Sequence, residues 1–194
     1  MGAAGMVAAK TAADNGAKAV IVEKCEEGKA GGNTKVCGQL FAYANGDKDA
    51  AKSYYTALAG GRDIEPEIID AISEGVANMA DILADEFGFN KDEYMDWTGV
   101  NVGGTNMGAM SPEYPEMPGH EKMALWTTHA GASDGYLYQG LKQNVTDRVD
   151  AIDVWYSSPA KSLIQDPVTK TVVGVTVERD GKEMNIRALS SASR

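Results

Sequence analysis

The sequence predicts an α/β fold, and two segments near the ends of the chain indicate this class. Near the N-terminus, a turn with two glycines leads into an alanine-rich helix and then into a continuous apolar strand at 19–22. Continuous apolar strands are typical of parallel sheets that are covered on both faces. Near the C-terminus, a short strand at 151–156 precedes a β-branched run at 172–178 and a hairpin turn at 179–182. These segments predict a parallel sheet with an added β-meander.

The first of these segments has a spacing that is typical of dinucleotide-binding folds. Gly2 and Gly5 are spaced like the last two glycines of G-x-G-x-x-G, and Asn15-Gly16 is a favourable helix stop. Glu23 closes the apolar strand about 20 residues after the glycines, where such folds place an acidic residue that binds a ribose. Because the turn, helix, stop, strand and acid occur in order, we predict a Rossmann-like domain.

Each residue type in this pattern has a physical role in holding a dinucleotide. The N-terminus of a helix presents unpaired N–H groups and a positive dipole end, which together bind a pyrophosphate. Small residues in the turn let the ligand approach the backbone, and a carboxylate can accept hydrogen bonds from ribose hydroxyls. We expect Gly2, Ala3, Ala4, Gly5 and Glu23 to bind the cofactor. The alternative is an ordinary turn between strand and helix that binds no ligand.

The same motif predicts a strand that the sequence does not contain. A glycine turn of this kind follows a buried central strand, whereas this sequence starts within the turn. The small and polar residues at 189–194 likewise give no sign of a last parallel strand. We therefore expect a partial domain, through a cloned or a natural truncation. Missing strands leave unpaired edges on their neighbours, so we also expect the fragment to self-associate.

Composition and charge exclude several functional classes. The 194 residues are 43% hydrophobic and carry a formal net charge of −10, which indicates a globular protein that does not bind nucleic acid. No apolar run is long enough for a membrane span and no signal peptide is present, so we expect a cytoplasmic protein unless a preceding segment directs export. The residues Cys25, Cys37, His120 and His129 show no metal-ligand spacing, and no metal site is expected.

A glycine-rich loop follows Glu23 and carries the most specific motif of the chain. Glu23-Lys24 is followed by G-G-N-T-x-x-[small]-G at 31–38. This combination resembles the FAD-binding domain of the fumarate reductase/succinate dehydrogenase flavoprotein superfamily, which includes 3-ketosteroid dehydrogenases and urocanate reductases. The resemblance covers nearly the whole chain. It implies a Rossmann-like FAD/NAD(P)-binding domain with a β-meander, whose first and last strands are missing here.

The resemblance also implies which residues contact FAD. In this family the loop passes beside the pyrophosphate and the isoalloxazine ring, which implies contacts from Lys24, Gly32, Asn33, Thr34, Cys37, Gly38 and Gln39. The family usually has a second glycine where this sequence has Gln39. A backbone amide after the strand that precedes the meander holds the adenine in the family, and Ala160 is the matching position.

Two helices are predicted after the loop, over 47–88. Asp47 is a candidate cap for a helix that runs to about Leu58, and Pro66 suits the first turn of the next helix. Apolar residues at helical spacing in the second helix are predicted to pack into the core, namely Ile68, Ile72, Val76, Met79 and Leu83. The resemblance implies a helical pair at this place in the family.

Regular patterns fade between 97 and 133, which predicts a long loop. The segment 131–135 matches the G-x-S-x-G motif of hydrolases, but 127–130 is a poor strand and no histidine follows Ser133. Because the hydrolase motif requires both, we exclude it. Ser133 or Asp134 is instead expected to cap a helix, and His129 is expected to have a structural role.

The helix that begins after this turn is predicted to place Leu137, Leu141, Val145 and Val149 on one face. The chain 1–194 is thus expected to be one partial FAD-binding domain. Its parts are the fingerprint and flavin loop at 1–38, the helical pair at 47–88, the long loop at 97–133, and the helix, strand and meander at 134–189.

The resemblance implies a flavin-dependent oxidoreductase. Members of the family move a hydride between FAD and an activated C–C bond of a small-molecule substrate, such as an unsaturated dicarboxylate, an enoate or an enone. Substrate-binding and proton-donating residues lie mainly in a cap that this sequence lacks. We therefore predict no catalytic residue and expect the chain alone to be inactive. Two alternatives are a fragment of an NAD-dependent dehydrogenase and a non-catalytic nucleotide-binding remnant.

Overall fold

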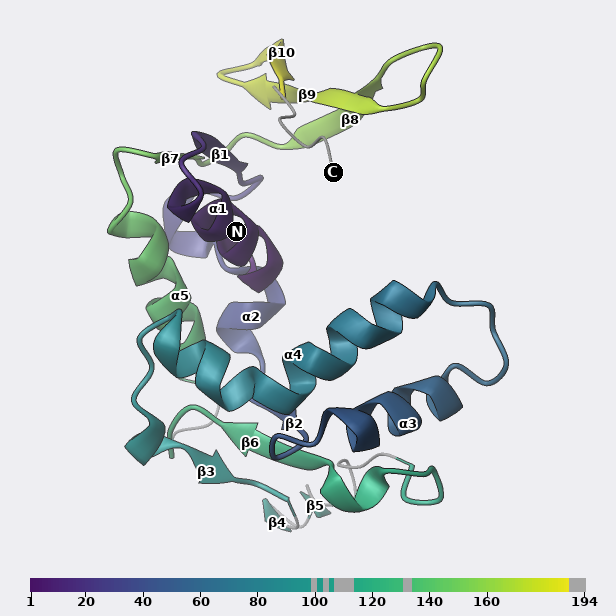
Figure 1. The fold of residues 1–194 in the computed structure, drawn as a ribbon. Helices are drawn as coiled ribbons and strands as arrows, with labels where there is room; N and C mark the ends of the chain where they lie inside the picture. Colours follow the sequence, from purple (N-terminus) through teal and green to yellow (C-terminus); the bar gives the residue numbers. More distant parts are fainter. Residues whose placement is uncertain (99–100, 103–104, 107–113, 131–133, 189–194) are drawn as a thin grey trace. The chain divides into compact units, whose positions relative to one another are not determined.

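The computed structural model describes residues 1–98, 101–102, 105–106, 114–130 and 134–188. The chain divides into two compact units, each of which is described by itself (Figure 1). The first unit comprises residues 1–34 and 141–194, and the second comprises residues 35–140. No helix among the described residues is long and apolar enough to cross a membrane.

A helix and two parallel strands form the centre of the first unit. Helix α1 (Ala3–Asp14) packs against strand β1 (Ala19–Val22) and buries Met6 and Ala9. Strand β1 pairs in parallel with β7 (Ile152–Trp155), in a register that joins Ala19 to Ile152 and Val22 to Trp155. Gly16 has a φ of +83°, so the predicted left-handed stop after the helix is confirmed.

The predicted β-meander is confirmed in the same unit. Strands β8 (Ala160–Gln165), β9 (Val172–Arg179) and β10 (Lys182–Arg187) form an antiparallel sheet in the order β10–β9–β8. Asp180 and Gly181 join the last two strands with φ angles of +52° and +70°. Positive φ at both central residues is the geometry of a type I′ hairpin turn, which explains why Asp-Gly is favourable here.

Two helices form a hairpin in the second unit. Helix α3 (Lys48–Leu58) is capped by Asp47, whose carboxylate accepts a hydrogen bond of 2.9 Å from Ala50 N, and α4 (Pro66–Asp85) begins with the predicted proline. The helices pack against each other around a core of Ala44, Ala51, Tyr54, Val76 and Met123. Both predicted helices are therefore confirmed.

Short strands complete the second unit. Strand β6 (Ala124–Thr127) lies between β2 (Leu40–Tyr43) and β3 (Met95–Asp96), and both neighbours are antiparallel to it.

The remaining described elements of the two units are η1 (Glu27–Lys29), α2 (Gly32–Val36), η2 (Lys91–Glu93), β4 (Asn101–Val102), β5 (Thr105–Asn106), η4 (His120–Lys122) and α5 (Tyr136–Thr146). The boundary between the units falls within α2 and α5.

The predicted apolar face of α4 is wrong in its first half. Ile68 and Ile72 are 51% and 41% exposed, whereas Ile69 and Ser73 are buried. Steps of four residues turn 40° past a full turn each time, so the stripe from Ile68 to Val76 winds around the helix. Alternating steps of four and three keep one face, and the buried residues Ile69, Ser73, Val76, Ala80 and Leu83 follow this alternation.

The prediction of a structureless loop over 97–133 is also wrong, because β6 lies inside it as the central strand of a sheet. Four residues are too few to show the alternation of a strand, and the prolines nearby favoured the prediction of a loop. The end of the last helix was predicted too late, since α5 ends at Thr146 and Val149 is 71% exposed. The prediction for Ser133 falls outside the described residues.

Asp14, in the last turn of α1, binds two cations of the first unit. Its carboxylate accepts hydrogen bonds of 2.7 Å from Lys10 Nζ and of 2.5 and 3.2 Å from Arg148 Nε and Nη2. The hydrogen bond from Arg148, followed by that from Lys10, lowers the pKa of Asp14 from 3.8 to about 2. The contact joins the end of α1 to the segment after α5.

Asp14→Asn is expected to lower the urea midpoint of unfolding at neutral pH. Because the pKa of Asp14 is lower in the folded chain than in the unfolded chain, its contribution is complete above about pH 4 and is lost as the pH falls towards about 2. The difference between the variant and the unchanged chain should therefore shrink over this range. A difference that is independent of pH would contradict the ion pair.

Gly119 is required by a close approach to α3. Its φ is +85°, and a Cβ atom at this position would overlap the carbonyl oxygen of Ala50. Gly46 has a similar φ of +81°, but no heavy atom lies within 4 Å of its corresponding Cβ position. The two glycines differ in their surroundings and not in their backbone conformation.

Gly119→Ala is expected to destabilise the fold more than Gly46→Ala. Both variants place alanine in the left-handed region, which costs about 1–2 kcal/mol. Only Gly119→Ala also forces the α3 backbone to move, which adds about 1–3 kcal/mol. Urea denaturation followed by circular dichroism measures both effects. Equal losses in the two variants would show that the contact with Ala50 relaxes without cost.

Candidate functional site

The segments that follow β1 and β7 meet at the carboxyl ends of these two parallel strands. Glu23 N donates to Trp155 O at 2.9 Å, Ser158 N donates to Glu23 O at 2.8 Å, and Ser157 N donates to Cys25 O at 2.9 Å. The backbone of Glu23 is therefore fixed on both sides. Ligands bind at this edge of open parallel sheets, so the location agrees with the predicted role of Glu23.

The Glu23 side chain is buried and is held by two donors. Its exposed fraction is 6%, and Oε1 accepts a hydrogen bond of 2.8 Å from Cys25 N. Oε2 forms an ion pair with the α-ammonium group of Met1, and burial lowers the pKa of that ammonium. A carboxylate is unfavourable in the interior unless donors surround it. Glu23 thus has the environment of an acceptor for hydroxyl or ammonium groups.

The first turn of α1 lacks a side-chain cap on Gly2 and an acidic residue, which suits the binding of an anion. Gly2 is the N-cap with an extended backbone (φ −96°, ψ 177°), makes no side-chain cap, and no acidic residue lies in the first turn. Ala3 N donates to Thr34 Oγ1 at 2.9 Å, which brings the predicted flavin loop to the turn. No heavy atom lies within 4 Å of a Cβ built on Gly5, so packing among the described residues does not require this glycine.

These features fit a dinucleotide. The structure brings the turn Gly2, Ala3, Ala4 and Gly5 together with Thr34, and the Met1 ion pair places Glu23 beside this turn. The helix start suits a pyrophosphate and the carboxylate suits a ribose diol. Lys24 is exposed, Gly32 and Asn33 are exposed within α2, and Ala160 is exposed at the start of β8.

Sequence reasoning missed Ser157 and Ser158. Ser158 is fully buried, and its Oγ donates to Tyr156 O at 2.8 Å, while Ser157 has a φ of +50°. The backbone amides of Ser157 and Ser158 donate to the carbonyl oxygens of Cys25 and Glu23, which joins the segment after β7 to the segment after β1. Ser-Ser-Pro after a short strand is a turn signal that could have indicated them.

The remaining predicted cofactor residues, Cys37, Gly38 and Gln39, belong to the second unit. Gln39 is 1% exposed and has a φ of +62°, and its backbone N–H donates to Cys37 Sγ at 3.4 Å. A positive φ explains why glycine is suited to this position. In this chain a glutamine occupies the left-handed conformation instead.

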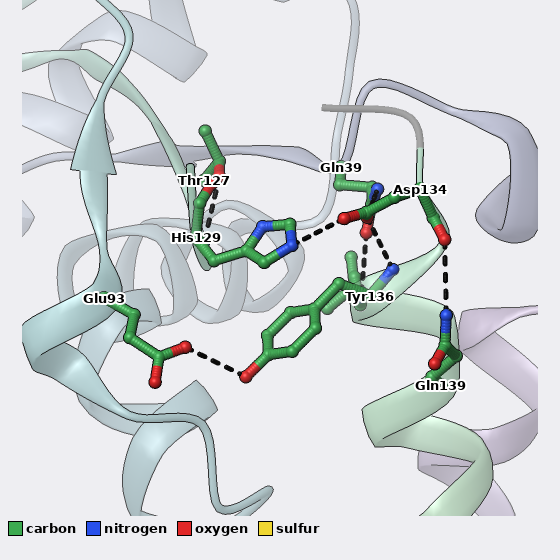
Figure 2. A network of polar contacts seen from close by, with 8 residues as sticks. Gln39, Glu93, Thr127, His129, Asp134, Tyr136 and Gln139 are labelled. Atoms are coloured by element: carbon green, nitrogen blue, oxygen red, sulfur yellow. Dashed lines mark hydrogen bonds and ion pairs between the residues drawn. The ribbon is translucent and has the colours of Figure 1, made fainter. Parts of the chain in front are cut away.

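A polar network surrounds Gln39 in the second unit (Figure 2). Asp134 accepts hydrogen bonds from Gln39 Nε2 at 2.7 Å and from Tyr136 N at 3.0 Å, and its other oxygen lies 2.7 Å from His129 Nε2. The bond to Tyr136 N places Asp134 at the predicted start of α5. The hydrogen bond from Gln39, then that from Tyr136, lowers the pKa of Asp134.

An aromatic pair extends this network. The His129 ring stacks on Tyr136 with ring centres 4.1 Å apart and planes at 14°, and Tyr136 Oη donates to Glu93 Oε2 at 3.1 Å. Each polar group named here has a partner within the fold, so these contacts agree with a structural role for His129. Among the described residues, no group of three histidine, cysteine or carboxylate side chains could hold a metal ion.

Comparison with known proteins identifies the family. The sequence matches the family described as FAD binding domain over residues 1–192. The fold is similar to 3-ketosteroid Δ1-dehydrogenase from Sterolibacterium denitrificans in complex with 1,4-androstadiene-3,17-dione, with a TM-score of 0.71 and 17% identity over 96% of this chain and 44% of that chain. No protein of curated function matches significantly.

A second solved structure shows the same relationship. The 3-ketosteroid-Δ4-(5α)-dehydrogenase from Rhodococcus jostii RHA1 in complex with 4-androstene-3,17-dione is similar with a TM-score of 0.67 and 20% identity, over 96% of this chain and 42% of that chain. The chain thus spans less than half the length of these solved relatives. Because the family match covers residues 1–192 of the 194, the chain belongs to the FAD binding domain family, and its cofactor is FAD.

Proposed function

We propose that this chain is the FAD-binding part of a flavin-dependent oxidoreductase that moves a hydride between FAD and an activated carbon–carbon bond. The observation that carries the proposal is the buried Glu23 carboxylate beside the open start of α1, in a chain that matches the FAD family along its length.

The adenosine half of FAD is assigned to the first unit. The pyrophosphate would lie at the N–H groups of the first turn of α1, where Gly5 leaves space and the helix dipole favours negative charge. The ribose would donate hydrogen bonds to Glu23, in place of the Met1 ammonium. The adenine is assigned to the backbone of Ala160 by the family resemblance.

The flavin half is assigned by resemblance to Asn33 and to Cys37, Gly38 and Gln39. FAD supplies the hydride acceptor or donor, and the protein supplies binding and orientation. The segment Cys37–Gly38–Gln39 offers backbone groups without a large side chain at Gly38. We assign no catalytic residue to this chain.

The substrate class is an activated C–C bond. The two similar structures hold ketosteroids in which a carbonyl is conjugated to a double bond, which supports an enone. The family resemblance equally includes unsaturated dicarboxylates such as fumarate. This chain is expected to be inactive alone, so the test uses a version extended to the full length of its solved relatives. Anaerobic oxidation of that reduced flavoprotein by fumarate, urocanate and an enone steroid would decide among these classes. Oxidation by none of them would refute this substrate assignment.

Glu23→Ala is expected to weaken FAD binding about tenfold or more. Loss of a hydrogen bond to a charged group costs about 1.5–3 kcal/mol, and about 1.4 kcal/mol corresponds to tenfold. Quenching of FAD fluorescence on titration with the protein measures the dissociation constant.

Glu26→Ala is the matched control for this variant. Glu26 lies three residues from Glu23 and is exposed, and its carboxylate forms an ion pair of 2.9 Å with the exposed Lys29. The substitution Glu26→Ala removes the same charge from the same loop and is expected to change the dissociation constant of FAD by less than about twofold. Equal effects of the two substitutions would remove Glu23 from the site, and an unchanged chain that does not bind FAD would refute the proposal itself.

A further inference from the structure

Gln39 occupies a backbone conformation that its residue type disfavours. Its φ is +62°, and its side chain is almost fully buried. The Cβ atom makes the left-handed region unfavourable for residues other than glycine, and asparagine and aspartate are the usual exceptions. A buried glutamine stays there only if its surroundings hold it.

Three hydrogen bonds hold Gln39, and two of them act on its side chain. Nε2 donates to Asp134 Oδ1 at 2.7 Å, Oε1 accepts from Leu137 N at 2.6 Å, and the backbone N–H donates to Cys37 Sγ at 3.4 Å. The side chain is thus fixed at both ends of its amide group by residues around the start of α5. Figure 2 shows Gln39 beside the Asp134 carboxylate, to which its amide group donates.

Asp134 is fixed in turn by groups from two elements. Its Oδ1 also accepts from Tyr136 N, its Oδ2 lies against His129 Nε2, and its backbone carbonyl accepts from Gln139 Nε2 at 3.3 Å. His129 itself is held by stacking on Tyr136. Because these partners fix the carboxylate in place, Asp134 can oppose a rotation of Gln39 instead of moving with it.

We propose that Asp134 is a positioning residue that holds Gln39 in the left-handed conformation and thereby sets the shape of the Cys37–Gly38–Gln39 segment. The consequence for the cofactor rests on the proposed function, which assigns this segment to the flavin ring. A glycine at position 39 would adopt the same backbone without help. In this chain the contact with Asp134 stabilises the left-handed conformation at position 39, which glycine would adopt because it has no Cβ atom.

The conformation of Gln39 can be measured without any ligand. An amide proton and its own Hα lie closer together when φ is positive, so their NOE is strong only in that conformation. We expect this NOE to be strong in the unchanged chain and to fall to the ordinary level in Asp134→Ala. The matched control is Asp47→Ala, which removes a capping carboxylate from α3 in the same unit and should leave the NOE of Gln39 strong.

Asp134→Ser provides a second variant if Asp134→Ala does not fold. The serine hydroxyl can still cap α5 through Tyr136 N, but the substitution removes the carboxylate that accepts from Gln39 and faces His129. The NOE of Gln39 is expected to fall in this variant as in Asp134→Ala. A strong NOE in either folded variant, equal to that of the unchanged chain, overturns the proposal.

The effect on the cofactor is separated from an effect on folding by a double-mutant cycle. Asp134→Ala should weaken FAD binding about tenfold when residue 39 is glutamine, and within about twofold when Gln39→Gly is already present. Equal losses of FAD affinity in both backgrounds would show that Asp134 acts only as a cap of α5, and this result would overturn its role towards the flavin. Failure of the unchanged chain to bind FAD refutes the proposed function, while the NOE still decides whether Asp134 holds Gln39.

Discussion

The backbone hydrogen bonds that join the ends of β1 and β7 are the constraint on which the arrangement of the first unit depends. They continue the parallel ladder beyond Val22 and fix the Cα atom of Glu23 before its side chain is considered. Because α1 packs against β1, the same ladder also fixes where the open start of the helix lies. The position of the buried Glu23 carboxylate relative to the start of α1 is therefore set by main-chain geometry.

This dependence explains why the sequence predicted the first unit well. Short-range signals specify each part: glycines for the turn, Asn-Gly for the stop, a β-branched run for β1, and Asp-Gly for the turn between β9 and β10. The family resemblance added the identity of the cofactor. What the sequence did not show was the contribution of Ser157 and Ser158, because these residues act through backbone amides that any residue except proline could supply.

Prediction was poorer in the second unit, where the decisive contacts link residues far apart in the chain. Strand β6 is stabilised by pairing with β2 and β3, and its four residues carry no period of their own. The elements that pack against α4 decide which of its faces is buried. The spacing of the isoleucines alone therefore wrongly predicted that Ile68 and Ile72 are buried. The partnership between Gln39 and Asp134 spans 95 residues and could not be inferred from either position alone.

The left-handed Gln39 also has a consequence for how this chain can change in evolution. A glycine at position 39 needs no partner. In such a chain residue 134 could therefore be any residue that can begin helix α5. A glutamine needs an acceptor opposite its amide. If glutamine replaced glycine before residue 134 was an acid, the left-handed glutamine would have no partner, so the acid is expected to arise first. Residues 39 and 134 are therefore expected to vary together among relatives, although neither lies near the other in sequence.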